Sequence, residues 1–316
     1  MTAIILIGLG AGLTSSLIFG SAFTASPLAV VLSYLTPLPL MIAGLGWGWR
    51  TAALGSGLGV AVAGAAFSAE AAVLFALTCA APATWLTQLA MLSRQDGGGP
   101  VEWYPPGRLL TRVSWAASGL VLAAMFYFGP DAESFRANAI VPVENWLYPM
   151  LEGGYASAEE TAAYARSYAS ILLVGAASMW ALVMLANLWL AGRVIRTSKR
   201  LQRPWPDLGA LDMPRVYGAV LAVMIVVSLT PGSPGMVAIA TANIWGSAYL
   251  LVGLAVIHTI TAGLAARAAI LTVVYLAVVL ILYAAVLVAL IGLLDPFVRI
   301  RARFGPRRGG PPARPD

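Results

Sequence analysis

Residues 2–23 read TAIILIGLGAGLTSSLIFGSAF, a stretch without a charged side chain. A helix needs about 20 apolar residues to cross the hydrocarbon core, so this stretch predicts a membrane-spanning helix. Small residues recur in it every four positions, at Gly8, Gly12, Ser16 and Gly20. We call these four residues the ladder, because helical spacing puts them on one face. Such a face admits close approach of another helix in lipid. We expect it to contact either the second or third hydrophobic segment of this chain, or another protein.

The whole chain is as apolar as its first stretch. Of its 316 residues, 60% are hydrophobic and 10% are charged, whereas a soluble domain has about 25% charged residues. The charges also cluster, leaving residues 1–49 and 216–266 free of them. These patterns predict an all-α, polytopic helical membrane protein. The single cysteine, Cys79, lies in an apolar run, so we expect neither an internal disulfide nor a multi-cysteine metal site.

Nine hydrophobic segments follow one another along the chain. They cover about 2–23, 28–47, 51–69, 71–93, 109–128, 168–192, 215–230, 236–262 and 267–293. Pro37 and Pro39 predict a kink in the second segment. The Arg-, Pro- and Gly-rich residues 305–316 predict a disordered basic tail.

Basic residues predict the orientation, because cytoplasmic loops carry an excess of Lys and Arg. The cluster in 193–203 should face the cytoplasm, together with Arg50, Arg94, Arg108 and the N-terminus, and the acidic loop 129–166 should lie outside. Nine crossings would put the basic tail outside. We therefore expect eight crossings, with segment 215–230 re-entrant or shallow. The excess of Arg over Lys is typical of a GC-rich bacterial gene, so the location we expect is a bacterial inner membrane.

Signatures of catalysis do not occur in the chain. The spans hold no paired carboxylates and no Cys-His arrangement, and the chain has no GxSxG elbow and no P-loop. We therefore expect no enzymatic activity, no ATPase of its own, no metal and no cofactor. The net charge of +6 reflects basic residues in loops and tail that serve topology, so we expect no nucleic-acid partner.

The external loop holds the candidate ligand-binding residues. Glu144, Asn145, Trp146 and Tyr148 combine polar and aromatic groups, as a small-ligand pocket does. The alternative is an aromatic belt at headgroup level.

Two amides and the single histidine of the chain lie inside the spans and are candidates for a specific role. Asn187 and Asn243 can hydrogen-bond between helices. His258 can do the same, or bind a ligand or a proton.

Several stretches together resemble one family. They are Leu38-Pro39-Leu40 with Ala43-Gly44-Leu45-Gly46, Asn187 before the basic cluster, Gly253-Leu254-Ala255-Val256-Ile257-His258, and Gly292-Leu293-Leu294-Asp295 with Arg299 and Arg301 close behind. In this order they resemble the YybS-like family of uncharacterised bacterial integral membrane proteins. The residues at family-signature positions are Asn187, Asn243, His258, Gly292, Asp295 and Arg299.

That family is grouped with the substrate-binding S components of energy-coupling-factor vitamin transporters. The resemblance implies a six-helix unit in residues 1–200, a first helix that docks through small residues on a coupling partner, and a substrate site near the outer face. The further membrane helices in 201–304 depart from the S-component pattern.

Two functions remain open from the sequence. The first is a small-molecule-binding or transport subunit without its own ATPase, with the bilayer, a coupling protein or a second copy of the chain as partners. The alternative is a non-transporting scaffold or assembly factor that uses the basic loop and tail. A membrane-embedded enzyme would rest on His258 and Asp295 alone.

Overall fold

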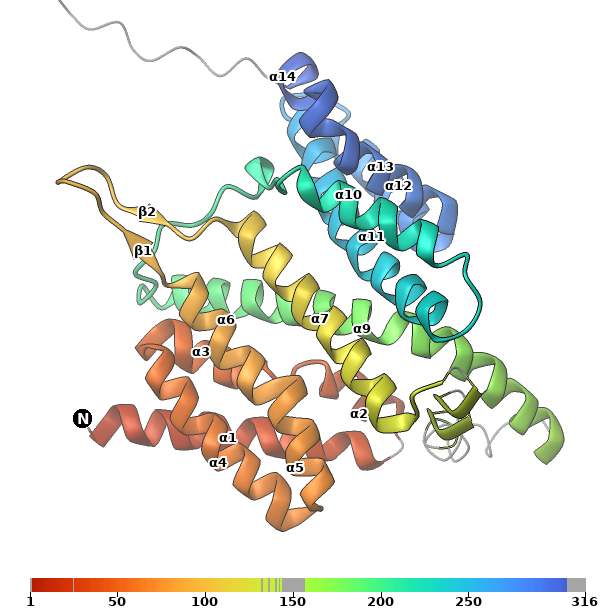
Figure 1. Ribbon diagram of the computed structural model, residues 1–316. Coiled ribbons are helices and arrows are strands. Elements are labelled where there is room, and N and C mark those ends of the chain that lie inside the picture. Colours follow the sequence, from red (N-terminus) through yellow and green to blue (C-terminus); the bar gives the residue numbers. More distant parts are fainter. Residues whose placement is uncertain are drawn as a thin grey trace, which may run out of the picture.

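The computed structural model describes residues 2–24, 26–131, 133–135, 137–139, 141, 143 and 157–305 (Figure 1). In these ranges the chain forms helices and one short hairpin, which confirms the all-α polytopic class. Six of the described helical segments are long and apolar enough to cross a membrane. A bent pair of helices near the C-terminus adds a seventh if it counts as one span.

The first hydrophobic segments form two parallel helices separated by a broken one. The elements are α1 (Thr2–Ser21), η1 (Ala22–Thr24), α2 (Pro27–Ser33), α3 (Leu38–Trp47) and α4 (Trp49–Ala66). Along the ladder α1 contacts α4 backbone to backbone: a Cβ on Gly8 would lie 2.8 Å from the Thr51 oxygen, and one on Gly12 would overlap the Gly55 oxygen. From one contact to the next the residue numbers increase in both α1 and α4, so the two helices run parallel. An internal partner therefore fills the ladder, which is one of the two arrangements that the sequence left open.

Prolines interrupt two of the apolar helices in mid-span. Between α2 and α3 the chain turns at 34–37, where the sequence predicts a kink from Pro37. The fourth segment consists of α5 (Ala69–Phe75), a π-helical turn η2 (Ala76–Ala80) and α6 (Ala81–Ala90). Pro82 lies just after this turn and has no N–H to donate to the Thr78 carbonyl, four residues earlier. Both interruptions leave backbone carbonyls without their helical partners.

The middle of the chain consists of a hairpin and two long helices. The strands β1 (Ser93–Arg94) and β2 (Glu102–Trp103) pair antiparallel, and α7 (Pro106–Phe128) and α9 (Ala158–Thr197) follow. A capping box of Ser157 and Glu160 begins α9. The Ser157 hydroxyl accepts from the Glu160 N–H, and the Glu160 carboxylate accepts from the Ser157 N–H.

The C-terminal helices pack on one side of α7 and α9 (Figure 1). They are η3 (Leu208–Ala210), α10 (Val216–Val227), α11 (Ser233–Ile260), α12 (Arg267–Leu280), α13 (Leu282–Val298) and α14 (Ile300–Phe304). Trp245 of α11 is fully buried here and stacks on Tyr217 at 4.9 Å between ring centroids. Leu110 of α7 belongs to the same apolar cluster, which therefore joins α11 to the preceding helices.

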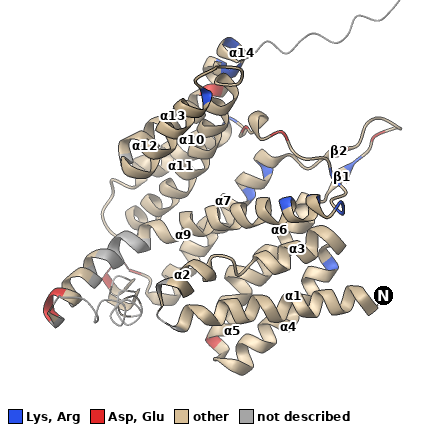
Figure 2. Cartoon of the chain, turned by 180° about the vertical axis from the view of Figure 1, so that it is seen from behind, with Lys and Arg blue, Asp and Glu red and all other residues tan. Residues whose placement is uncertain are grey.

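Basic residues from distant parts of the chain meet at one end of the bundle. Arg203 donates to the carbonyls of Ala90 and Tyr104 at 2.7 and 3.3 Å, and the Arg200 guanidinium lies 5.1 Å from the centre of the Trp47 ring. We call this the basic end. Figure 2 shows Lys and Arg there and acidic residues at the opposite starts of α5 and α9. That the basic end faces the cytoplasm stays a prediction.

A sharp bend lies in the ninth hydrophobic segment. There α12 and α13 bend by 117° around Ile281, and α13 returns along α11. No Gly or Pro marks this bend in the sequence. The bend brings Arg301 back to the basic end. Segment 215–230 forms the 12-residue α10, which is shorter than the candidate spans, so its shallow or re-entrant course stays a prediction, as does the number of crossings.

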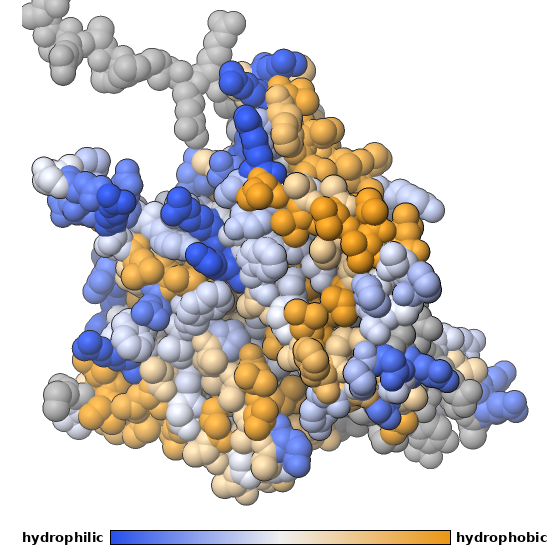
Figure 3. Space-filling view, in the orientation of Figure 1, coloured by the Kyte–Doolittle hydropathy of each residue, from blue (hydrophilic) through white to orange (hydrophobic). Residues whose placement is uncertain are grey.

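Large apolar side chains cover much of the surface. Figure 3 shows them over the C-terminal helices and over the N-terminal helices, with hydrophilic side chains at the hairpin and at α14. Leu6 and Leu17 of α1 and Val279 and Leu280 of α12 are more than half exposed. Such surfaces fit contact with lipid, where apolar side chains need no protein cover.

Candidate functional site

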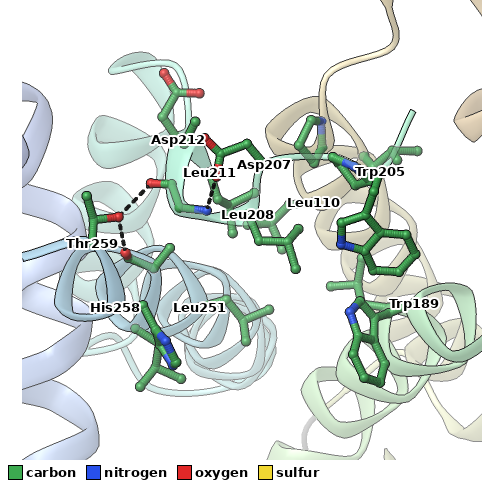
Figure 4. Close-up of a pocket in the computed structure, with 18 of the residues that line it drawn as sticks. Leu110, Trp189, Trp205, Asp207, Leu208, Leu211, Asp212, Leu251, His258 and Thr259 are labelled. Carbon is green, nitrogen blue, oxygen red and sulfur yellow. Dashed lines mark hydrogen bonds between the residues drawn. The ribbon is translucent and has the colours of Figure 1, made fainter. Parts of the chain in front are cut away.

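A cavity of about 1500 Å³ opens between α9 and α11 at the basic end (Figure 4). Its walls are leucines from three helices: Leu109 and Leu110 of α7, Leu182, Leu185 and Leu188 of α9, and Leu251 and Leu254 of α11. Residues 205–212, which include η3, cover it on one side. A pocket that is mostly apolar with a few polar groups is the usual form of a small-molecule site.

Two tryptophans, Trp189 of α9 and Trp205 of the covering loop, form one side of the cavity. Trp189 and Trp205 lie 6.4 Å apart between ring centroids, edge to face. Arg193 makes a cation–π contact with both rings: its guanidinium lies 5.6 Å from the centre of the Trp189 ring and 5.9 Å from that of the Trp205 ring. Arg196 lies 5.2 Å from Trp205. Cation–π contact holds these two exposed arginines against tryptophans that line the cavity, although neither arginine lines it itself.

The cover over the cavity is held by hydrogen bonds from both halves of the chain. The Gly209 carbonyl accepts from the Thr259 hydroxyl at 3.0 Å and from Arg301 at 2.8 Å. On the other side Arg203 anchors the loop to Ala90. Burial lowers the pKa of Arg203, but a guanidinium remains protonated in proteins. The loop is therefore pinned at two points that lie on either side of the cavity.

Polar side chains of α11 and α12 complete the wall opposite the tryptophans. His258 Nε2 lies 2.8 Å from the Tyr275 hydroxyl, and the two rings pack edge to face at 5.9 Å. Arg267 also lines this part. Figure 4 shows His258 and Leu251 across the open space from Trp189 and Trp205. The cavity thus combines a leucine-lined interior with aromatic and cationic groups at its mouth.

The family-signature residues lie in several different places. His258 and Asp295 both line the cavity, and Asp295 forms an ion pair with Arg301 at 2.8 Å. Arg299 adopts a left-handed conformation between α13 and α14, and Gly292 packs against α11. Asn243 of α11 donates to the Val174 carbonyl and the Ser178 hydroxyl of α9, at 3.3 and 3.2 Å.

The other candidate residues are not in the cavity. Asn187 is buried in α9, where it bonds to the Tyr34 carbonyl at 2.8 Å. Ser16 of the ladder is buried beside α4, and a Cβ on Gly20 would overlap the Phe67 ring. The candidate ligand residues of the external loop, Glu144, Asn145, Trp146 and Tyr148, lie outside the described residues. Their role stays a prediction.

The sequence did not single out most of the residues that line the cavity. Trp189, Trp205, Thr259 and Tyr275 were not candidates. One signal was available, because Trp189 and Arg193 stand four residues apart and so share a helix face. The remaining residues come together only through the packing of α9 against α11.

Comparison with known proteins supports the membrane assignment. Residues 155–296 match a family model described as "Predicted membrane protein (DUF2232)". These residues include α9, α10, α11 and α12 and most of α13, and so contain the main walls of the cavity. No curated protein and no solved structure matches the chain.

Proposed function

We propose that this membrane protein binds a small amphiphilic molecule in the cavity between α9 and α11. The supporting observation is the form of the cavity, with leucine walls below and aromatic, cationic and backbone polar groups at its mouth. Burying apolar surface is worth about 25 cal/mol per Å², so leucine walls favour a hydrocarbon body. Arg267, which also lines the cavity, offers N–H donors to a polar head.

The positive charge next to the cavity supports an acidic head group. Arg193 and Arg196 are exposed, and among the described residues no carboxylate pairs with either of them. Their guanidinium groups are already oriented by the tryptophan rings. A phosphate or carboxylate accepts two parallel N–H bonds from such a group, so an anionic amphiphile is the ligand class that we propose.

Within this proposal the protein is a binding or transport subunit that has no ATPase of its own and no enzymatic activity. The resemblance to YybS-like proteins and to S components supports a coupling protein, or a second copy of the chain, as its partner. The bacterial inner membrane and a cytoplasmic basic end belong to the same proposal. With the head group at the rim, the ligand would be presented on the side of the basic loop.

A cavity-filling variant tests the proposal. Ala186 lines the cavity and is exposed on α9, so Ala186→Trp should place an indole ring against the ligand's position without disturbing the core. Protein purified in mild detergent should retain an amphiphile that mass spectrometry identifies in the wild type and finds depleted at least tenfold in the variant. Ala176→Trp, an exposed position on the same helix outside the cavity, is the control and should retain the ligand. Equal retention by both variants would argue against the cavity as the binding site.

A scaffold or assembly function is the second proposal, and the exposed arginines at the basic end favour it. Each Lys or Arg near an anionic surface is worth about 1 kcal/mol. If this function is right, neutralising the basic residues of 193–203 and removing 305–316 should abolish cellular function, while insertion and amphiphile content stay normal. If the amphiphile is lost as well, the binding function is favoured.

A further inference from the structure

A second polar site lies in the middle of the bundle, away from the cavity cover. Four elements contribute to it: Ser15 of α1, the turn 34–37 between α2 and α3, Cys79 of η2, and Asn187 of α9. All three named side chains are at least 97% buried. Each lies near the middle of an apolar segment. Polar groups at this depth are costly to bury, so their arrangement calls for an explanation.

The interrupted helix supplies two backbone carbonyls to this site. In the described part of the chain no backbone N–H donates to the carbonyl of Tyr34 or of Thr36. Each accepts one side-chain donor instead: Asn187 Nδ2 reaches the Tyr34 oxygen at 2.8 Å, and the Ser15 hydroxyl donates to the Thr36 oxygen. A carbonyl oxygen has two lone pairs, so both oxygens keep one acceptor position.

The π-helical turn is held from the same face of α9. Trp180 Nε1 donates to the Thr78 carbonyl at 2.7 Å, replacing the N–H that Pro82 lacks. Trp180 and Asn187 stand seven residues apart and therefore share one helix face. Ser15 contacts both interruptions. Its hydroxyl donates to the Thr36 carbonyl in the turn 34–37, and its Oγ lies 3.7 Å from Sγ of Cys79 in η2. One face of α9 thus bonds to both interruptions in the membrane interior.

One polar atom of this arrangement has no partner. Asn187 Oδ1 is fully buried and accepts no hydrogen bond, whereas Nδ2 of the same amide donates to Tyr34 and Val183, each at 2.8 Å. Because Nδ2 touches the Tyr34 oxygen, Oδ1 also lies beside the turn 34–37. An acceptor left unpaired at this depth costs about 1–3 kcal/mol. A ligand that interacts with oxygen would remove that cost.

We propose that the turn 34–37 and Asn187 bind a monovalent metal cation, with Asn187 Oδ1 and the carbonyl oxygens of Tyr34 and Thr36 as ligands. All these donors are hard, neutral oxygens. Ca²⁺ and Mg²⁺ sites in proteins use carboxylates, and none lies among the residues described at this turn. Neutral carbonyl, amide and hydroxyl oxygens instead replace the hydration shell of Na⁺ or K⁺. Unwound helices at the membrane midplane coordinate cations in the same way in transporters.

This site is independent of the proposed amphiphile, since none of its residues lines the cavity. It also differs from ordinary interhelical bonding. Asn243 has the same side chain in a neighbouring span, but it is exposed and donates to two oxygens of α9. Asn243 therefore provides a control with the same side chain outside the buried site.

Cation binding is tested first on the wild-type protein in detergent. Thermal unfolding is measured in NaCl and KCl, each replaced stepwise by choline chloride at constant ionic strength, and binding of ²²Na⁺ or of the K⁺ tracer ⁸⁶Rb⁺ is measured directly. We expect saturable binding of one cation per chain and a rise of several degrees in the unfolding midpoint with one of the two cations. Equal midpoints in all three salts together with no saturable tracer binding would overturn the proposal and leave a buried water as the occupant.

Variants then assign the site. Asn187→Leu should lose the cation-dependent shift and at least tenfold in affinity, while Asn243→Leu should keep both. If Asn187→Leu does not fold, Ser15→Ala offers a second variant, because it removes the hydroxyl that orients the Thr36 carbonyl. A cation-dependent shift that survives in Asn187→Leu, or in Ser15→Ala if only that variant folds, would place the cation elsewhere and overturn the proposal.

Discussion

Gly292 of α13 lies directly on Gly253 of α11. A Cβ on Gly292 would come 2.5 Å from the Gly253 nitrogen and would overlap the Tyr249 oxygen. In lipid, helices associate through close van der Waals packing and not through a hydrophobic driving force, so two glycines that face each other allow the tightest contact. This crossing holds the returning helix α13 against the bundle.

A larger residue at the crossing should release α13. In Gly292→Leu the side chain has no space between the two backbones, and we expect a loss of at least about 2 kcal/mol of stability. Gly246→Leu on α11 is the control, because a Cβ there meets nothing within 4 Å. Unfolding in denaturing detergent measures both variants. Equal stability of the two would contradict the crossing.

The ladder should behave in the same way at the N-terminus. Gly12→Leu would drive a side chain into the Gly55 backbone and should lower expression and thermal stability. Gly10→Leu, two residues away on the exposed side of α1, should be tolerated because a Cβ there has open space. If Gly12→Leu folds normally and only a bound protein is lost, the ladder is a docking surface for another protein.

The ion pair of Asp295 and Arg301 should hold α14 on the cavity cover. Its two side chains are 10% and 16% exposed, and the Asp295 carboxylate also accepts from the Arg301 N–H at 3.0 Å. Arg301→Gln leaves a mostly buried carboxylate without its cation, which costs about 3 kcal/mol locally. Hydrogen exchange should then rise in 205–212 and 299–305. Arg303→Gln, at an exposed position of the same helix, should leave exchange unchanged.

The start of α9 should respond to acid. Hydrogen bonds from the Ser157 N–H and hydroxyl lower the pKa of Glu160 below its ordinary 4.5. A carboxyl with a lowered folded-state pKa stabilises the folded state above its unfolded value, and this stabilisation is lost as the pH falls through the folded value. A spin label at the exposed position 164 should therefore become more mobile as the pH falls from 6 to 3. In Glu160→Gln this transition should disappear, whereas Glu159→Gln should retain it.

Much of the architecture was predictable because its signals are local. Runs of apolar residues predicted the helices, and Pro37 predicted the interruption between α2 and α3. Basic residues predicted that Arg50, Arg94, Arg108 and 193–203 share one end, and Arg203 and Arg200 bring these segments together by direct contact. The bend at Ile281 was not predictable, because its neighbours Leu280 and Leu282 are good helix formers.

The residues of the candidate sites likewise divide into those that the sequence indicated and those that only the folded structure brings together. His258 was a candidate because a histidine inside an apolar segment stands out in the sequence. Trp189 and Trp205 did not stand out, because tryptophan is common near membrane interfaces and only packing puts these two across one cavity from Leu251 of α11. The unpaired oxygen of Asn187 likewise depends on where the Tyr34 carbonyl lies.

The amino-acid sequence was enough to predict a multi-pass helical membrane protein, its helical stretches, and the basic segments that lie at the same end. These properties follow from apolar length and charge, which each segment carries alone. The tertiary structure alone decided that α4 fills the ladder, that α13 returns along α11, and that a cavity lies between α9 and α11. The physical reason is that many helix faces in this chain are small and apolar. In lipid such faces are nearly equivalent until close packing and interhelical hydrogen bonds select among them.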